Sequence, residues 1–308
     1  MPGKHARPLK VGLILPDTEG QMNGATARWS DFQAMAREAE AIGCDSLWVT
    51  DHLIHRAERG EQGPWECWSL ISALAAVTER VEIGTLVLCA GFRNPAHLAK
   101  MADTVDEISG GRLILGIGAG WNQAEYRAFG YPFDHRVDRF EEAATIITTL
   151  LREGQIDFRG AYYEAIDCVL RPRGPRSSGP PIMVGTGSGS RMLRLTVRFA
   201  DQWNLWFGTY HNRVDELAEF QKAADQVCRE EGRDPATLER TAAVMIEVGS
   251  HAPSQMSSVP ISGSPAEIAE ELLRFAQIGV SHIQVWIEPN TIAGIQAFGK
   301  VIEELDRS

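Results

Sequence analysis

Short apolar runs alternate with amphipathic segments along almost the whole chain, and this alternation constrains the fold more than any other feature of the sequence. A continuous apolar run of this kind is typical of a strand buried on both faces, as in a parallel sheet. The amphipathic segments predict helices, as in 29–42, where one face carries Phe32, Met35, Ala36, Ala39 and Ile42. The expected strands are 10–15, 46–50, 81–88, the first half of 112–125, 181–185, 202–207, 241–248 and 282–287.

Eight strands that alternate with eight helices predict a TIM (β/α)8 barrel, which is an α/β fold. An open doubly wound sheet is the alternative, but its Gly-x-Gly-x-x-Gly signature belongs after the first strand, where this chain has Leu15-Pro16-Asp17. We expect a disordered tail at 1–9 and one barrel domain over 10–308. An insertion is expected around 155–180, because a hairpin pattern at 156–164 and several prolines interrupt the period there.

Composition excludes several classes of function. A formal net charge of −11 argues against a nucleic-acid surface, and the five cysteines are too widely spaced for a disulfide framework or a zinc site. No apolar run reaches the roughly 20 residues that a membrane helix needs, and the first ten residues lack the apolar segment of a signal peptide. We therefore expect a cytoplasmic protein with no nucleic-acid or membrane partner. We also expect it to act on a small molecule and to form a homodimer.

Polar side chains stand where several expected strands end. Catalytic residues of a barrel collect at the carboxyl ends of its strands. His52 is the main catalytic candidate, since a histidine titrates near neutrality and can donate a proton or a hydrogen bond to a substrate or cofactor oxygen. The structural alternative is that His52 only closes its loop by bonding a backbone carbonyl. The other candidates at strand exits are Asp51, Cys89, Asn122 and the turn from Gly187 to Ser190.

A metal site is the rival interpretation of the first exit, where Asp51 and His52 are followed by His55. The spacing is weak evidence, because a metal-dependent barrel hydrolase would need further ligands at other strand exits. The fifth expected strand instead ends in Gly-Thr-Gly-Ser. We expect no metal.

The segment 185–191, Gly-Thr-Gly-Ser-Gly-Ser-Arg, lies between an expected strand and an expected helix. Free backbone N–H groups and the positive end of a helix would face the same point, which predicts a phosphate site formed by Gly187, Ser188, Gly189 and Ser190. Arg191 and Arg194 would supply the positive charge that this acidic chain otherwise lacks. The alternative is a plain flexible loop, because glycine and serine also form ordinary turns.

Several motifs in order resemble one family. They are Ser46-Leu-Trp-Val-Thr-Asp-His52, Gly84-Thr-Leu-Val-Leu88 with Phe92-Arg-Asn-Pro95, Gly110 to Asn122, and Pro181 to Gly189 with Ala200-Asp-Gln-Trp-Asn204. Together they look like the bacterial-luciferase-like flavin and deazaflavin oxidoreductases. The resemblance covers nearly the whole chain.

This resemblance implies a TIM barrel that holds a reduced flavin or the deazaflavin coenzyme F420 at its mouth, with the phosphate on the glycine turn. It also implies a cis peptide bond between Leu86 and Val87 against the cofactor ring. By the same resemblance, His52 and Asn122 would lie beside the ring or the substrate. We also expect Asp51 and Cys89, as residues at strand exits, to contact the cofactor.

One departure from the family pattern bears on the reaction. Relatives that oxidise alcohols or sugar phosphates resemble Gly-x-Gly-Glu, with the glutamate as proton donor, whereas Ala119 follows Gly118 here. Glu125 lies too far along the chain to be assumed a replacement. We therefore expect F420-dependent reduction of an activated double bond or imine. The alternatives are an FMN-dependent monooxygenase that uses oxygen, and a flavin-binding protein without turnover.

Overall fold

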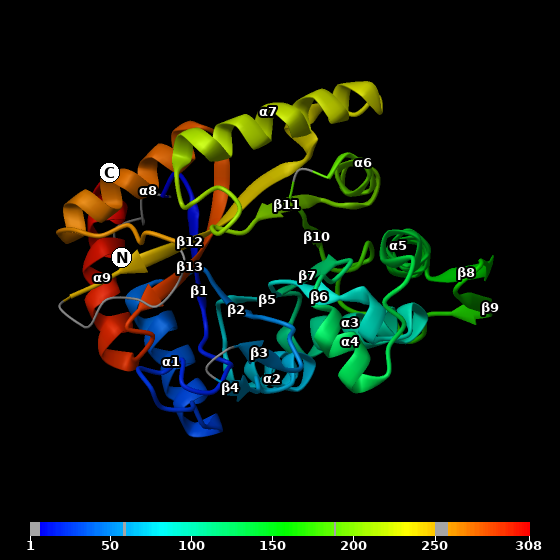
Figure 1. Ribbon diagram of the computed structural model, residues 1–308, viewed down its shortest axis with the longest axis horizontal. Coiled ribbons are helices and arrows are strands. Elements are labelled where there is room, and N and C mark those ends of the chain that lie inside the picture. Colours follow the sequence, from blue (N-terminus) through cyan, green and yellow to red (C-terminus); the bar gives the residue numbers. More distant parts are fainter. Residues whose placement is uncertain (1–6, 58–59, 188, 250–257) are drawn as a thin grey trace.

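The computed structural model describes residues 7–57, 60–187, 189–249 and 258–308. Its main sheet closes on itself, because β10 pairs with β11 on one side and with β7 on the other, and all the pairings are parallel. The strands surround a packed interior, and helices cover the outside (Figure 1). The barrel strands are β1 (Lys10–Ile14), β2 (Ser46–Val49), β5 (Glu82–Thr85), β7 (Leu113–Gly118), β10 (Ile182–Gly185), β11 (Gln202–Leu205), β12 (Glu239–Glu247) and β13 (Val280–Glu288).

This closed parallel barrel confirms the predicted fold class. The helices that alternate with the strands are α1 (Trp29–Ile42), α2 (Cys67–Val77), α3 (Pro95–Ser109), α5 (Arg136–Glu153), α6 (Ser190–Phe199), α7 (Val214–Glu230), α8 (Pro265–Gln277) and α9 (Ile292–Arg307). Within the described ranges, none of the helices combines the length and the apolar character that crossing a bilayer requires.

Glycines allow a large side chain to fill the barrel interior. Trp48 is fully buried, and its indole Nε1 donates to Ser46 Oγ at 2.7 Å. A Cβ atom added to Gly84 would lie 2.1 Å from the Trp48 ring, and one added to Gly12 would lie 2.1 Å from Ser46 Oγ. These strands accept the tryptophan because two neighbouring positions carry no side chain.

The stretch rich in glycine at the end of β7 brings two strands unusually close. A Cβ atom on Gly116 would lie 1.9 Å from the carbonyl oxygen of Thr85, which is backbone and cannot move aside. Thr85 Oγ1 accepts from the Gly116 N–H at 2.9 Å and donates to the Gly116 carbonyl at 2.7 Å. The absence of a side chain at Gly116 therefore allows the backbones of β5 and β7 to approach closely.

Short elements in the connecting segments differ from the predictions. The expected hairpin extends over β8 (Gln155–Arg159) and β9 (Glu164–Val169), and it projects from one edge of the molecule in Figure 1. Elements that were not predicted include the pair β3 (His55–Ala57) and β4 (Gly60–Gln62), and the helix α4 (Gln123–Phe129). They are too short for a hydrophobic period to mark them.

Residues 7–9, which were expected to be part of a disordered tail, pack against the barrel domain. Leu9 is buried, and the Arg7 guanidinium donates to Asp45 at 2.8 Å and to the carbonyl of Gly43 at 2.7 Å. These contacts join residues 7–9 to the loop between α1 and β2. Residues 1–6 lie outside the described residues.

Candidate functional site

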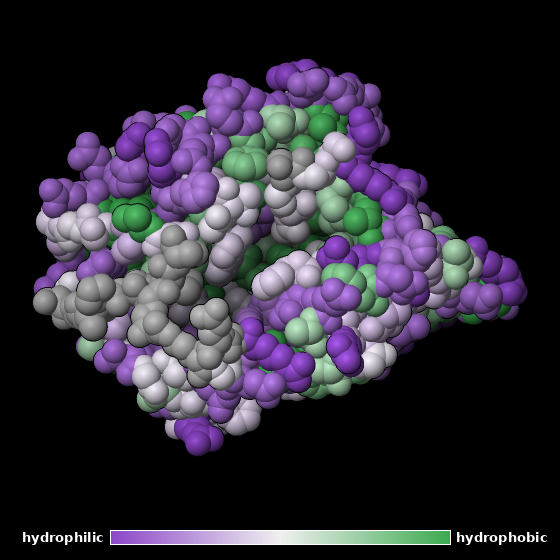
Figure 2. Space-filling view, viewed as in Figure 1, coloured by the Kyte–Doolittle hydropathy of each residue, from purple (hydrophilic) through white to green (hydrophobic). Residues whose placement is uncertain are grey.

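The candidate site lies where β2, β5, β7 and β10 end. Because parallel neighbouring strands end at the same side of the barrel, the segments that follow them converge there. Figure 2 shows that the molecular face toward the viewer is hollowed near its centre and that apolar residues are visible inside the hollow. The predicted site residues fall on these segments.

His52 lies just beyond β2 and is hydrogen-bonded to the carboxylate of Glu125, which lies in the first turn of α4. Its ring nitrogen Nδ1 lies 3.0 Å from Glu125 Oε1 and 3.2 Å from Oε2. The Glu125 side chain is only 3% exposed, whereas that of His52 is 22% exposed. Sequence position alone did not allow Glu125 to be assumed part of the site, but the first turn of α4 brings it to the exit of β2.

The two groups hold each other in their charged forms. Burial by itself would lower the pKa of His52, but the hydrogen bond and negative charge of Glu125 outweigh it, so the His52 pKa is raised. Burial by itself would raise the pKa of Glu125, but the hydrogen bond and charge of His52, together with the backbone N–H groups of Leu53 and Ile54, outweigh it, so the Glu125 pKa is lowered. Both shifts favour an imidazolium beside a carboxylate.

Two aromatic rings flank His52. The ring of His55, on β3, has its centre 4.5 Å from that of His52, and burial together with the charge of His52 lowers the His55 pKa. Trp121 meets His52 edge-on at 5.7 Å between ring centres and is 70% exposed. A large apolar side chain that stays in solvent beside a charged histidine offers a contact surface to a flat ligand.

Asn122 lies one residue before α4 and holds two segments together. Its Oδ1 accepts from the Ala124 N–H at 3.2 Å, and its amide nitrogen donates to the Ile54 carbonyl at 3.3 Å. Asn122 is thus the N-cap of α4 and a link to the segment after β2. Its predicted contact with a cofactor stays a prediction.

Asp51 is buried, and both oxygens of its carboxylate accept hydrogen bonds from neighbouring residues. Oδ2 accepts from Arg93 Nη1 at 2.7 Å and from the Cys89 N–H at 2.8 Å, and Oδ1 accepts from Arg93 Nη2 at 2.9 Å. Arg93 also donates to Glu66 at 2.8 Å. In this arrangement Asp51 fixes the segment after β6 (Leu88–Cys89), and its predicted cofactor contact stays untested.

Cys89 is packed beneath the exit of β7. Its Sγ lies 2.8 Å from the Tyr126 hydroxyl, which in turn donates to the Ala119 carbonyl at 2.9 Å. Burial raises the pKa of the Cys89 thiol to about 11, so it is not a thiolate near neutrality. Gly120 has φ +72°, and a Cβ atom there would lie 2.5 Å from Cys89 Sγ.

The peptide bond between Leu86 and Val87 is cis, as the resemblance implied. Val87 is packed between two strands that present glycine to it. A Cβ atom on Gly118, at the end of β7, would lie 3.0 Å from Val87 Cγ2, and one on Gly185, at the end of β10, would lie 2.9 Å from it. This wall of the site is formed by one valine and by bare backbone.

The glycine turn before α6 is open. A Cβ atom on Gly189 would meet nothing within 4 Å, and one on Gly187 would meet only a methyl group of Thr209 at 3.7 Å. Neither glycine has a positive φ. Gly189 is the N-cap of α6 without a side-chain bond, and Ser190 begins the helix. Ser188 lies outside the described residues.

The arginines of this helix do not leave the turn positively charged. Arg191 forms ion pairs with Asp138 at 2.5 Å and Glu141 at 2.9 Å. Arg194 lies 3.4 Å from Glu231 and 3.8 Å from Glu230. The expected positive charge is therefore compensated by acidic side chains of neighbouring helices, and a phosphate here would depend mainly on backbone N–H groups and the helix end.

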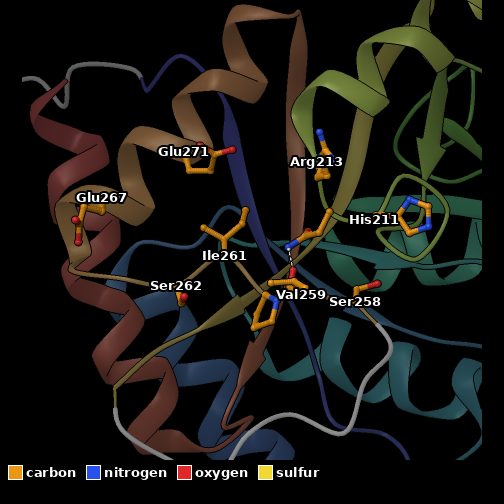
Figure 3. A pocket seen from close by; sticks show the side chains of 10 residues that line it. His211, Arg213, Ser258, Val259, Ile261, Ser262, Glu267 and Glu271 are labelled. Atoms are coloured by element: carbon orange, nitrogen blue, oxygen red, sulfur yellow. Dashed lines mark hydrogen bonds between the residues drawn. The ribbon is translucent and has the colours of Figure 1, made fainter.

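A separate hollow of about 630 Å³ lies between the start of α7 and the start of α8. Its lining includes His211, Arg213, Glu267 and Glu271, with Asn212 donating to the Val259 carbonyl at 3.1 Å (Figure 3). His211 and Arg213 both pair with Glu216. This hollow is formed by segments that follow β11 and β12, and none of the predicted site residues within the described ranges lines it.

The closed parallel barrel, with the candidate site at the carboxyl ends of its strands, makes this a TIM-barrel protein. The chain belongs to the luciferase-like monooxygenase family, whose sequence pattern matches residues 9–254. This membership confirms the resemblance drawn from the motifs.

Two curated relatives carry different activities. Over 164 residues the chain is 37% identical to the F420-dependent glucose-6-phosphate dehydrogenase of Amycolatopsis mediterranei, covering 51% of this chain and 47% of that enzyme. Over 243 residues it is 28% identical to the pyrimidine monooxygenase RutA of Allorhizobium ampelinum, covering 73% of this chain and 64% of that protein. The chain thus spans about half of the first relative and just under two thirds of the second.

A solved structure supports the fold over the full length. The F420-dependent secondary alcohol dehydrogenase in complex with an F420-acetone adduct superposes with a TM-score of 0.80, covering 96% of this chain and 99% of that one. The identity is 20%. At this identity the likeness establishes the architecture and leaves the reaction open.

Proposed function

We propose that the protein is an oxidoreductase that transfers hydride between a bound deazaflavin, F420, and a small organic substrate. The reaction that fits best is reduction of an activated carbon–carbon double bond or an imine. The observation that carries this proposal is the buried Glu125 carboxylate on Nδ1 of His52 at the exit of β2. A histidine held in its charged form is suited to give a proton to an acceptor.

The residues at the barrel mouth fit such a cofactor. Gly187, Gly189 and Ser190 would hold its phosphate, because the turn is open where a side chain would otherwise stand. Val87, backed by bare backbone on both sides, would lie against the flat ring. When bound, F420 would supply a hydride.

In this proposal His52 supplies the proton. Because Nδ1 is occupied by Glu125, Nε2 is the nitrogen that can transfer a proton. One carbon of the double bond would gain the hydride and its partner atom would gain the His52 proton, so the substrate takes up two hydrogens. Ala119 occupies the position of the glutamate in the Gly-x-Gly-Glu pattern of dehydrogenating relatives. The absence of that proton donor favours reduction over alcohol oxidation.

The second candidate function is an FMN-dependent monooxygenase, because one relative is named a pyrimidine monooxygenase. A reduced flavin reacts readily with oxygen, whereas a 5-deazaflavin does so poorly. A flavin-binding protein without turnover is the third candidate. As part of the proposal, we infer that the protein works as a homodimer on a small substrate.

The test offers reduced F420 without oxygen, together with a panel of cyclic enones and imines. We expect at least one acceptor to restore the visible absorbance of the oxidised deazaflavin, and His52→Ala to slow that reaction. Consumption of reduced FMN that requires oxygen, with no oxidation of reduced F420 by any acceptor, would replace the proposal by the monooxygenase function. Binding without turnover under both conditions would support the carrier.

A further inference from the structure

We propose that Glu125 is a positioning residue that keeps a proton on Nδ1 of His52 and thereby sets the pH above which the enzyme stops working. This inference deepens the proposed function and rests on it, because the effect on turnover requires the proposed activity. Its effect on the histidine itself can be measured without cofactor or substrate.

Glu125 is anchored as well as close. Its Oε1 accepts from the Leu53 N–H at 2.8 Å and lies 3.3 Å from the Ile54 N–H, in addition to the contact with His52 Nδ1 at 3.0 Å. All three donors belong to the same short segment after β2. Asn122, at the start of α4, also donates to the Ile54 carbonyl. The carboxylate is therefore fixed relative to the imidazole by the backbone that carries the imidazole.

The chemistry of a carboxylate then decides the tautomer. An ionised carboxylate only accepts hydrogen bonds, so Nδ1 of His52 must carry the hydrogen. A neutral His52 would have its remaining proton on Nδ1 and none on Nε2. Only the charged form of His52 can therefore give a proton from Nε2, and the proton donor is lost as the pH rises through the His52 pKa in the folded protein.

Several charged groups face His52 from the surrounding elements, and most of them favour the charged form. Glu125 comes from α4, Asp17 from the segment after β1, and Asp51 is the preceding residue, with its charge partly compensated by Arg93. The His55 ring packs against that of His52 with 4.5 Å between ring centres, and its lowered pKa leaves it neutral where His52 is charged. Among the residues that the structure describes, Glu125 is the one carboxylate bonded to the ring, so its removal should have the largest effect.

The experiment follows the His52 ring by ¹⁵N NMR in the protein without cofactor, and His52→Gln identifies the signal. Wild type is compared with Glu125→Gln, which keeps the shape and an acceptor for the Leu53 N–H but removes the charge. His55→Gln is the matched control, because it alters a ring next to His52 without touching the carboxylate. Melting temperatures show whether each variant is folded.

We expect neutral His52 in wild type to carry its proton on Nδ1, and the His52 pKa to fall by about 1–2 pH units in Glu125→Gln. In His55→Gln the His52 pKa should stay the same or rise, because a ring that carries no negative charge is lost. Neutral wild-type His52 protonated on Nε2 would overturn the inference, whether or not the variant folds. A folded Glu125→Gln protein with an unchanged His52 pKa would overturn it too.

Turnover gives a second readout that a purely structural role would not move. In Glu125→Gln the loss of activity with rising pH should occur about 1–2 pH units lower than in wild type, and activity should recover at low pH. If neither F420 nor FMN supports turnover while the NMR result holds, the proposed function fails and the role of Glu125 on His52 stands.

Discussion

Replacing Asp51 by asparagine should destabilise the fold before it affects the cofactor. Asp51 is 1% exposed and Arg93 is 13% exposed in their side chains, and the carboxylate receives two N–H groups of Arg93 and one of Cys89. Breaking a buried ion pair by removing one partner typically costs about 3–5 kcal/mol. Arg93 keeps Glu66 as a partner, so we expect the lower end, about 3 kcal/mol.

The assay for Asp51→Asn is thermal unfolding followed by calorimetry. A loss of about 3 kcal/mol should lower the melting temperature by roughly 5 °C in a chain of this size. Asp138→Asn is the control, because Asp138 forms an exposed pair with Arg191 and its loss should change little. Cofactor affinity is measured well below the transition, where both variants are folded.

The opposite pattern would refute this reasoning. If Asp51→Asn melted like wild type but bound the cofactor much more weakly, Asp51 would be a direct cofactor ligand. The buried pair with Arg93 would then be a minor part of its role.

Three further predictions concern the site. Gly189→Val should melt like wild type but bind the cofactor about tenfold more weakly or worse, because the added side chain fills the open turn; equal losses of melting temperature and affinity would indicate a plain loop. His52→Ala should lower turnover by about 10²–10⁴-fold with cofactor affinity within a few fold, and unchanged turnover in steady-state assays would leave His52 a structural role. The His52–Glu125 pair should make wild type more stable than Glu125→Gln, and this difference in stability should be largest just below pH 6.5. The difference should be lost as the pH rises through the raised His52 pKa and, at acid pH, as the pH falls through the lowered Glu125 pKa. A difference in melting temperature that is constant with pH would contradict this.

The barrel could be predicted because its signal is repeated. Each strand is an apolar run and each long helix has its own apolar face, so an error in one element leaves the count intact. The exits of the strands follow from the fold class, which is why the sequence predicts that His52 and Asn122 lie at strand exits. Short elements such as α4 have no period long enough to detect.

Contacts between side chains could not be predicted in the same way. His52 and Glu125 are 73 positions apart, and they meet because the unpredicted helix α4 turns back toward the exit of β2. Arg191 looked available from sequence but pairs with Asp138 and Glu141 of α5. Spacing along the chain does not report which charges tertiary packing brings together.

Titration of the purified protein with F420 and, separately, with FMN tests the central claim most directly. If the protein depends on F420, we expect saturable binding of F420, seen as a change in its absorbance or fluorescence, with weaker binding of FMN. The Gly189→Val variant should lose most of that affinity, because both the phosphate and the added side chain need the open turn before α6. Tight binding of FMN with no response to F420 at low salt would contradict the account and leave the monooxygenase function in its place.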